Sequence, residues 1–231
     1  MLNIDKLDQF YGQAHTLRKI SLNVPKGSCT VLMGRNGVGK TTLLKCIIGL
    51  LSSRNGAIQL DGNDVTQLAT EQRAVAGIGY VPQGRQIFPQ LTVEENLSVG
   101  LPARRDGSKQ IPDSIYTLFP VLKDMCARRG GDLSGGQQQQ LAIGRALVTE
   151  PDVLLLDEPT EGIQPNIVKE IGSIISRLNS ETGLTVLLVE QKLAFAQRVG
   201  DAFALMDRGQ IAASGAMIEL NDDLIRRYLT V

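Results

Sequence analysis

Short apolar runs alternate along the chain with longer segments in which apolar residues recur every three or four positions. Continuous apolar runs are typical of buried strands, and the periodic segments are typical of helices that pack on a sheet. This alternation predicts an α/β fold around a parallel sheet. The predicted strands are residues 29–33, 78–81, 153–156, 185–189, 202–206 and 210–213. The predicted helices are residues 41–50, 193–199 and 222–229, with two more that begin after Ser134 and at Pro165.

Two stretches depart from this alternation. Near the N-terminus, short strands at residues 2–7, 20–24 and 57–60 are separated by turns, which predicts a small, mostly antiparallel β subdomain. From residue 84 to about 129 strand-like runs disappear and prolines separate short helical pieces, so we expect an inserted helical subdomain. The expected boundaries are a core of residues 1–83 and 150–231 and a helical subdomain of residues 84–149.

Composition narrows the classes of protein. The chain has 231 residues, with 24 Lys+Arg and 24 Asp+Glu. It therefore has no excess of positive charge that would favour the binding of nucleic acid. No apolar run approaches the roughly 20 residues that span a bilayer, and the first residues lack the pattern of a signal peptide. The three cysteines show no C-x-x-C spacing and indicate small core residues in a reducing compartment. The basic pair Arg104–Arg105 indicates a solvated surface.

The clearest chemical motif follows the first buried strand. Residues 34–42, GRNGVGKTT, fit the phosphate-binding pattern G-x-x-x-x-G-K-[ST]. The glycines let successive N–H groups face one point, and the following helix adds the positive end of its dipole. Lys40 is expected to reach the β- and γ-phosphates and Thr41 to ligate Mg²⁺, while an ordinary glycine turn is the alternative. The expected phosphate-binding residues are Gly34, Asn36, Gly37, Gly39, Lys40, Thr41 and Thr42.

A second candidate anion site lies at a helix start. Ser134 followed by Gln137 predicts a capping box. Gly135 and Gly136 destabilise the first turn of a helix by roughly 1 kcal/mol each relative to alanine. Glycines at these positions are reasonable if a ligand or another part of the protein approaches the helix backbone closely. Bare N–H groups, a hydroxyl and little side-chain bulk favour an anion there, and a capped helix start is the alternative.

Two adjacent carboxylates end the strand at residues 153–156. Asp157 and Glu158 are expected in the crevice where open α/β sheets bind ligands. Beside a phosphate loop, Asp157 is expected to hold Mg²⁺ through water, and Glu158 to orient or deprotonate the attacking water. An acidic turn without a ligand is the alternative.

These motifs together resemble the ATP-binding subunits of ABC transporters over nearly the whole chain. That resemblance implies a P-loop NTPase with a RecA-like parallel core that binds ATP and Mg²⁺. It implies that Tyr11 stacks on adenine, where the residues alone also allow an aromatic that packs on its own sheet. It further implies that Gln83 and Gln191 act in catalysis beside Lys40 and Glu158, and that Gln83 joins the magnesium ligands. The motifs stand in the family order: Tyr11, residues 34–42, Gln83, residues 133–137 and residues 153–158.

Members of this family dimerise head to tail, so the resemblance implies that ATP lies between one P-loop and the partner's Ser134–Gln137 segment. It also implies transmembrane permease subunits, an indirect solute-binding protein, and a peripheral position at the cytoplasmic face of the inner membrane. Residues 81–85, 91–97 and 188–191 resemble branched-chain amino acid importers, whereas residues 135–140 and 157–165 are similar to the urea-importing branch. We expect a urea importer, with an amino acid importer as the alternative. A soluble ABC ATPase acting on DNA or ribosomes is disfavoured because one domain without heptad repeats is present.

Two positions depart from the family pattern. Gln191 stands where the family usually carries a histidine, and Gln164 stands where it carries an aspartate. His15 is the only histidine in the chain and lies near Tyr11, far from that position in sequence. Because these two positions differ from the family pattern, the sequence is compatible with a second ATP-binding subunit that is either an identical or a different chain.

Overall fold

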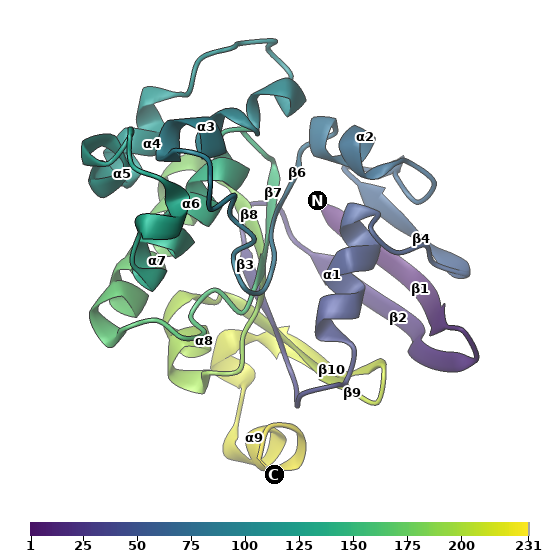
Figure 1. Ribbon diagram of the computed structural model, residues 1–231. Helices are drawn as coiled ribbons and strands as arrows, with labels where there is room; N and C mark the ends of the chain where they lie inside the picture. The colour runs from purple at the N-terminus through teal and green to yellow at the C-terminus, as the bar shows by residue number, and fades with distance from the viewer. Residues whose placement is uncertain (231) are drawn as a thin grey trace.

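The computed structural model describes residues 1–230, and its larger sheet carries the predicted buried strands. Five neighbouring strands are parallel, and at one edge β10 (Gln210–Ala216) pairs antiparallel to β9 (Ala202–Asp207). Every residue of β3, β7 and β8 is buried, because helices cover one face of the sheet, and the helix α1 (Lys40–Ile48) with the smaller sheet covers the other (Figure 1). The sheet order is β10 (Gln210–Ala216), β9 (Ala202–Asp207), β3 (Cys29–Met33), β8 (Thr185–Val189), β7 (Val153–Asp157) and β6 (Ile78–Val81).

The smaller sheet is antiparallel, as predicted, but its strands are longer than the sequence pattern indicates. Its order is β2 (Ala14–Val24), β1 (Leu2–Tyr11), β4 (Asn55–Leu60) and β5 (Asn63–Asp64). Lys6 and Lys19 take positive φ angles of 46° and 50°, and the β1–β2 register shifts nearby. These irregularities interrupt the apolar alternation, which is why the predicted strands end early. Tyr11 is consequently the last residue of β1.

The core helices agree with the predicted periodicity except at their ends. The first helix, α1 (Lys40–Ile48), lies between the two sheets (Figure 1). It ends two residues before the expected position because Gly49 takes a φ of 86° and caps it. No helix within residues 1–230 combines the length and apolarity that crossing a membrane needs. The other helices around the core are α2 (Thr70–Val75), which the pattern missed, α7 (Pro165–Thr182), α8 (Leu193–Val199), the short η3 (Met217–Glu219) and α9 (Asp222–Tyr228).

The helical pieces expected between residues 84 and 149 gather on one side of the larger sheet (Figure 1). Their buried residues, such as Phe119, Leu122 and Leu141, belong to the same apolar cluster as Leu154 and Leu188 of the sheet. The helical part and the sheet therefore share one core. The elements of the helical part are α3 (Val93–Ser98), η1 (Leu101–Ala103), α4 (Asp113–Leu118), α5 (Pro120–Asp124), η2 (Gly130–Asp132) and α6 (Gly135–Leu147).

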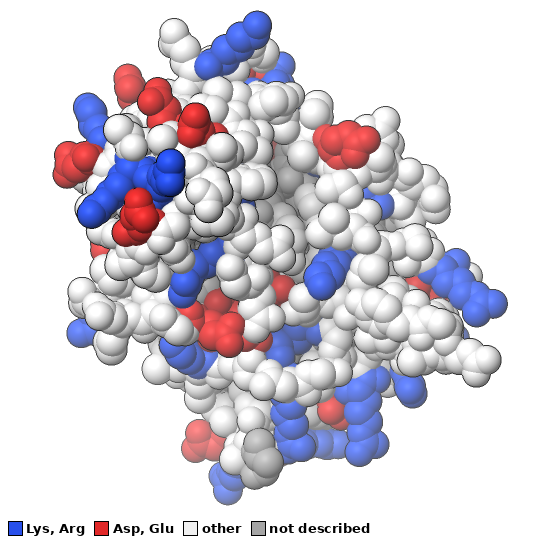
Figure 2. Space-filling view, in the orientation of Figure 1, with Lys and Arg blue, Asp and Glu red and all other residues white. Residues whose placement is uncertain are grey.

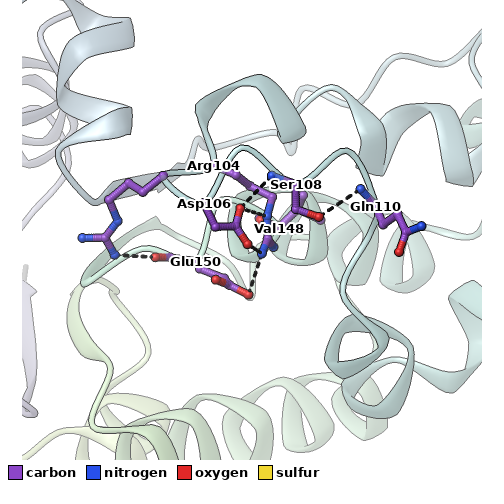
Figure 3. A network of polar contacts seen from close by, with 7 residues as sticks. Arg104, Asp106, Ser108, Gln110, Val148 and Glu150 are labelled. Carbon is purple, nitrogen blue, oxygen red and sulfur yellow. Dashed lines mark hydrogen bonds and ion pairs between the residues drawn. The ribbon is translucent and has the colours of Figure 1, made fainter.

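A polar network ties the loop after η1 to the segment between α6 and β7 (Figure 3). Arg104 pairs with Asp106 at 2.5 Å and Glu150 at 3.1 Å, and donates to the carbonyl of Val148 at 3.1 Å. Only 6% of its side chain is exposed, so the expectation of a solvated pair is wrong for Arg104. Sequence offers no sign of this burial, since the partners come from two separate segments.

Candidate functional site

The loop between β3 and α1 has the backbone that the phosphate-binding pattern predicts. Gly34, Gly37 and Gly39 have φ angles of 153°, 79° and 112°, and a Cβ at Gly34 would collide with the carbonyl oxygen of Met206. Lys40 is 5% exposed, and its Nζ donates to the carbonyls of Gly34 at 2.8 Å and Arg35 at 2.9 Å. The loop therefore holds one ammonium group close to its own backbone.

Burial lowers the pKa of Lys40, although the carboxylates of Glu158, Asp157 and Glu190 act in the opposite direction. Lys40 is thus a cation beside these three carboxylates. Near the middle of the face in Figure 2, acidic and basic side chains lie next to each other.

Asp157 ends β7 beside the start of α1. It is 1% exposed, its Oδ1 accepts from Thr41 Oγ1 at 3.2 Å, and its Oδ2 has no hydrogen-bond partner. Burial raises the pKa of Asp157 to about 6; the Thr41 bond opposes this and the Glu158 charge adds to it. A buried carboxylate oxygen without a partner, next to a hydroxyl, fits a hard cation such as Mg²⁺.

This arrangement is not a closed cage for a metal. Within residues 1–230 no group of three or more His, Cys, Asp or Glu side chains could hold an ion alone. Mg²⁺ typically uses one or two carboxylates and takes its other ligands from water and substrate phosphates. The Asp157 carboxylate and the Thr41 hydroxyl are oxygen ligands that fit this mode of Mg²⁺ binding.

Glu158 follows Asp157 and lies between two glutamine amides. Its Oε1 accepts from Gln191 Nε2 at 2.5 Å, and its Oε2 accepts from Gln83 Nε2 at 3.4 Å. The Gln83 amide also donates to Glu161 Oε2 at 2.9 Å. Gln83, Glu158 and Gln191 follow β6, β7 and β8, so parallel strands bring them to one edge. The structure therefore assembles a carboxylate with two neutral donors beside the P-loop.

One open cavity of about 480 Å³ connects these groups. Tyr11 is one of its lining residues and is 48% exposed. Neither Gly34 nor Asp157 is among the lining residues. The predicted residues that line the cavity are Tyr11, Asn36, Gly37, Gly39, Lys40, Thr41, Thr42, Gln83, Glu158 and Gln191.

The predicted anion site at α6 lines a different cavity, of about 350 Å³. The capping box forms: Gln137 N donates to Ser134 Oγ at 3.4 Å, and Ser134 N donates to Gln137 Oε1 at 2.9 Å. A Cβ at Gly136 would lie 2.9 Å from Ile167 of α7. Packing against α7 therefore already explains one of the two glycines. Within one chain, Ser134–Gln137 and the P-loop do not meet.

Glu190 is a buried residue of this region that sequence reasoning did not single out. It is 2% exposed and accepts bonds from Gln191 N at 2.7 Å, Lys192 N at 2.9 Å and Thr160 Oγ1 at 2.7 Å. It joins the segment after β8 to the segment after β7. The available signal was an acid directly after a buried strand, the same signal that marked Asp157.

A profile of the ABC transporter family matches residues 17–161. The chain is also 39% identical, over 99% of both sequences, to the high-affinity branched-chain amino acid transport ATP-binding protein BraG of Pseudomonas aeruginosa. The chain belongs to the ABC transporter family. A second relative, a probable branched-chain amino acid transport ATP-binding protein LivF of Archaeoglobus fulgidus, is 38% identical and covers 95% of this chain and 94% of its own.

Solved ABC cassettes share the fold. A nucleotide-free cassette from an ABC transporter superposes with a TM-score of 0.83 at 27% identity and covers 100% of this chain and 95% of its own. A dimeric bacterial ABC transporter cassette gives 0.84 at 25% identity, covering 94% and 99%. The predicted P-loop NTPase fold is confirmed, and this ABC protein is an ATP-binding ATPase.

Proposed function

We propose that this ABC ATPase powers a membrane importer of branched-chain amino acids. The observation that carries the proposal is the 39% identity with BraG over 99% of both chains. LivF supports the same solute class, so the comparisons favour the amino acid alternative over the urea importer that the sequence motifs first suggested. A role on nucleic acid has less support, because the net charge is zero.

In this proposal the P-loop cavity binds ATP. Lys40 contacts the β- and γ-phosphates, the loop backbone from Gly34 to Thr42 surrounds them, and Tyr11 stacks on the base. Mg²⁺ would be held by Thr41, Gln83 and, through water, Asp157. When bound, it would neutralise phosphate charge. Glu158 orients and deprotonates the attacking water, while Gln191 donates a neutral hydrogen bond to the γ-phosphate.

A second ATP-binding subunit completes the site. The cavity at Ser134–Gln137 is separate from the P-loop cavity, so a head-to-tail partner is needed to bring the two against one nucleotide. We propose that a dimer of this kind closes on ATP. Glu158→Gln should trap the closed dimer. If this variant dimerises in Mg-ATP without an added partner, the two subunits are identical. If it dimerises only when a second ATPase chain is added, the two subunits are different.

The permease is proposed to dock where the core meets the helical part. A groove of about 260 Å³ lies there, between the end of α1, α2 and the residues after α3. Leu50 and Val99 line it and are 55% and 46% exposed. We propose that these two apolar side chains contact the permease. This docking would place the protein peripherally at the cytoplasmic face of the membrane, with a solute-binding protein acting on the far side.

The test is reconstitution of the ATPase with the membrane subunits that co-purify with it. ATP-dependent uptake of leucine, isoleucine and valine should be measured beside uptake of urea, with Lys40→Ala as the inactive control. Uptake of the amino acids but not urea supports the proposal. Uptake of urea alone would restore the first expectation, and failure to recover any membrane subunit would contradict a transport role.

A further inference from the structure

The tip of the β1–β2 hairpin carries Tyr11 beyond the rest of its sheet. Pairing between β1 and β4 ends at Asp8–Asn55, so residues 9–11 pair only with β2. The strands are joined by the two-residue turn Gly12–Gln13. A two-stranded hairpin is marginally stable by itself. The position of the Tyr11 ring at the cavity therefore depends on what stabilises this tip.

A pair of aromatic side chains stabilises the hairpin tip at the cross-strand pair next to Tyr11. Phe10 and His15 face each other across the strands, with ring centroids 4.0 Å apart and planes inclined by 11°. The guanidinium of Arg54 lies 5.2 Å from the centroid of Phe10. Cross-strand aromatic pairs of this kind contribute roughly 0.2–1 kcal/mol to the stability of a ladder.

The same histidine is fixed to the body of the sheet. His15 Nε2 lies 2.8 Å from Asp8 Oδ1, and this carboxyl also accepts from Lys19 N at 3.0 Å and Asn55 Nδ2 at 3.4 Å. Burial alone would raise the pKa of Asp8, but these hydrogen bonds outweigh it, so the pKa is lowered. Asp8 is therefore an ionised anchor that links β1, β2 and β4 to the His15 ring.

We propose that His15 is a positioning residue for the nucleotide base: through its stack on Phe10 and its bond to Asp8 it holds the hairpin tip that presents Tyr11 to the P-loop cavity. The side chains of neighbouring residues in a strand point to opposite faces. The Phe10–His15 pair therefore stabilises the tip on the face opposite to Tyr11, which lines the cavity. The inference rests on the proposed ATP site. It predicts that His15 affects only the part of the affinity that comes from the base.

The experiment compares Mg-ATP with magnesium tripolyphosphate, which has the phosphates without the base, by calorimetry on the full chain. His15→Ala should weaken ATP binding by about two- to fivefold, the range of one cross-strand aromatic contact, and leave tripolyphosphate binding unchanged. Phe10→Leu removes the stack from the other strand and should give the same selective loss. Gln13→Ala, in the exposed turn, is the matched control and should change neither affinity.

Tyr11→Ala separates this inference from the ATP site itself. If Tyr11→Ala weakens ATP binding, His15→Ala should add no further loss in that background, because its effect passes through Tyr11. Additive losses, equal losses for both ligands, or unchanged ATP affinity in both His15→Ala and Phe10→Leu would overturn the inference. Unchanged ATP affinity in Tyr11→Ala itself would instead refute the proposed base contact.

Discussion

Replacing Glu190 by alanine tests the buried contact between the segments after β7 and β8. The carboxylate accepts bonds from two backbone N–H groups, of Gln191 and Lys192, and from the Thr160 hydroxyl. A hydroxyl can turn to another acceptor, but the two backbone donors cannot. Bonds to a charged acceptor contribute about 1.5–3 kcal/mol each, so the loss of two should lower the free energy of unfolding of Glu190→Ala by about 3–6 kcal/mol.

The assay is urea unfolding followed by far-UV circular dichroism, with the midpoint and slope fitted together. Glu190→Gln keeps an acceptor oxygen for the two backbone donors, so we expect it to lose only about 1 kcal/mol. Glu181→Ala is the surface control: its carboxylate pairs with Arg177 where both side chains are about half exposed, and it should change stability by less than about 1 kcal/mol. A loss below about 1 kcal/mol for Glu190→Ala, or equal losses for both Glu190 variants, would refute the reasoning.

Four further outcomes are expected. Lys40→Ala removes a charged donor to the phosphates and should weaken ATP binding ten- to a hundredfold, as calorimetry would measure, since such contacts are worth about 1.5–3 kcal/mol. Glu158→Gln should bind Mg-ATP normally but hydrolyse it about two to four decades more slowly in a phosphate-release assay; wild-type turnover would place the base elsewhere. Gln191→Ala should cost about 0.5–1.5 kcal/mol of transition-state stabilisation, or up to about tenfold in turnover, and no change would leave Gln191 structural. The hydrogen bond from Arg104, together with one from the backbone N–H of Ser108, lowers the pKa of Asp106 to about 2, so these contacts add stability above pH ~4 and lose it as the pH falls towards 2. In Arg104→Ala an NMR titration should find the Asp106 pKa raised, but still below its ordinary value because Ser108 N still donates to the carboxylate.

The sequence by itself determined the local features of this protein. Continuous apolar runs predicted β3, β7 and β8, because a strand buried on both faces needs apolar residues at every position. The P-loop was equally clear, since its chemistry depends on glycines and Lys40 within nine consecutive residues. The capping box at Ser134 could be predicted for the same reason. In each case the interacting groups are neighbours in the chain.

Only the tertiary structure decided which distant residues meet. Gln83 and Gln191 reach Glu158 from 75 and 33 residues away, because β6, β7 and β8 are parallel neighbours that end at one edge. The burial of Arg104 likewise depends on partners from another segment. Gly136 is small partly because α7 packs against it, which no local pattern reveals. Apolar periodicity reports which side of an element is buried but not what covers it, so such contacts follow from the order of the strands and the packing of the helices.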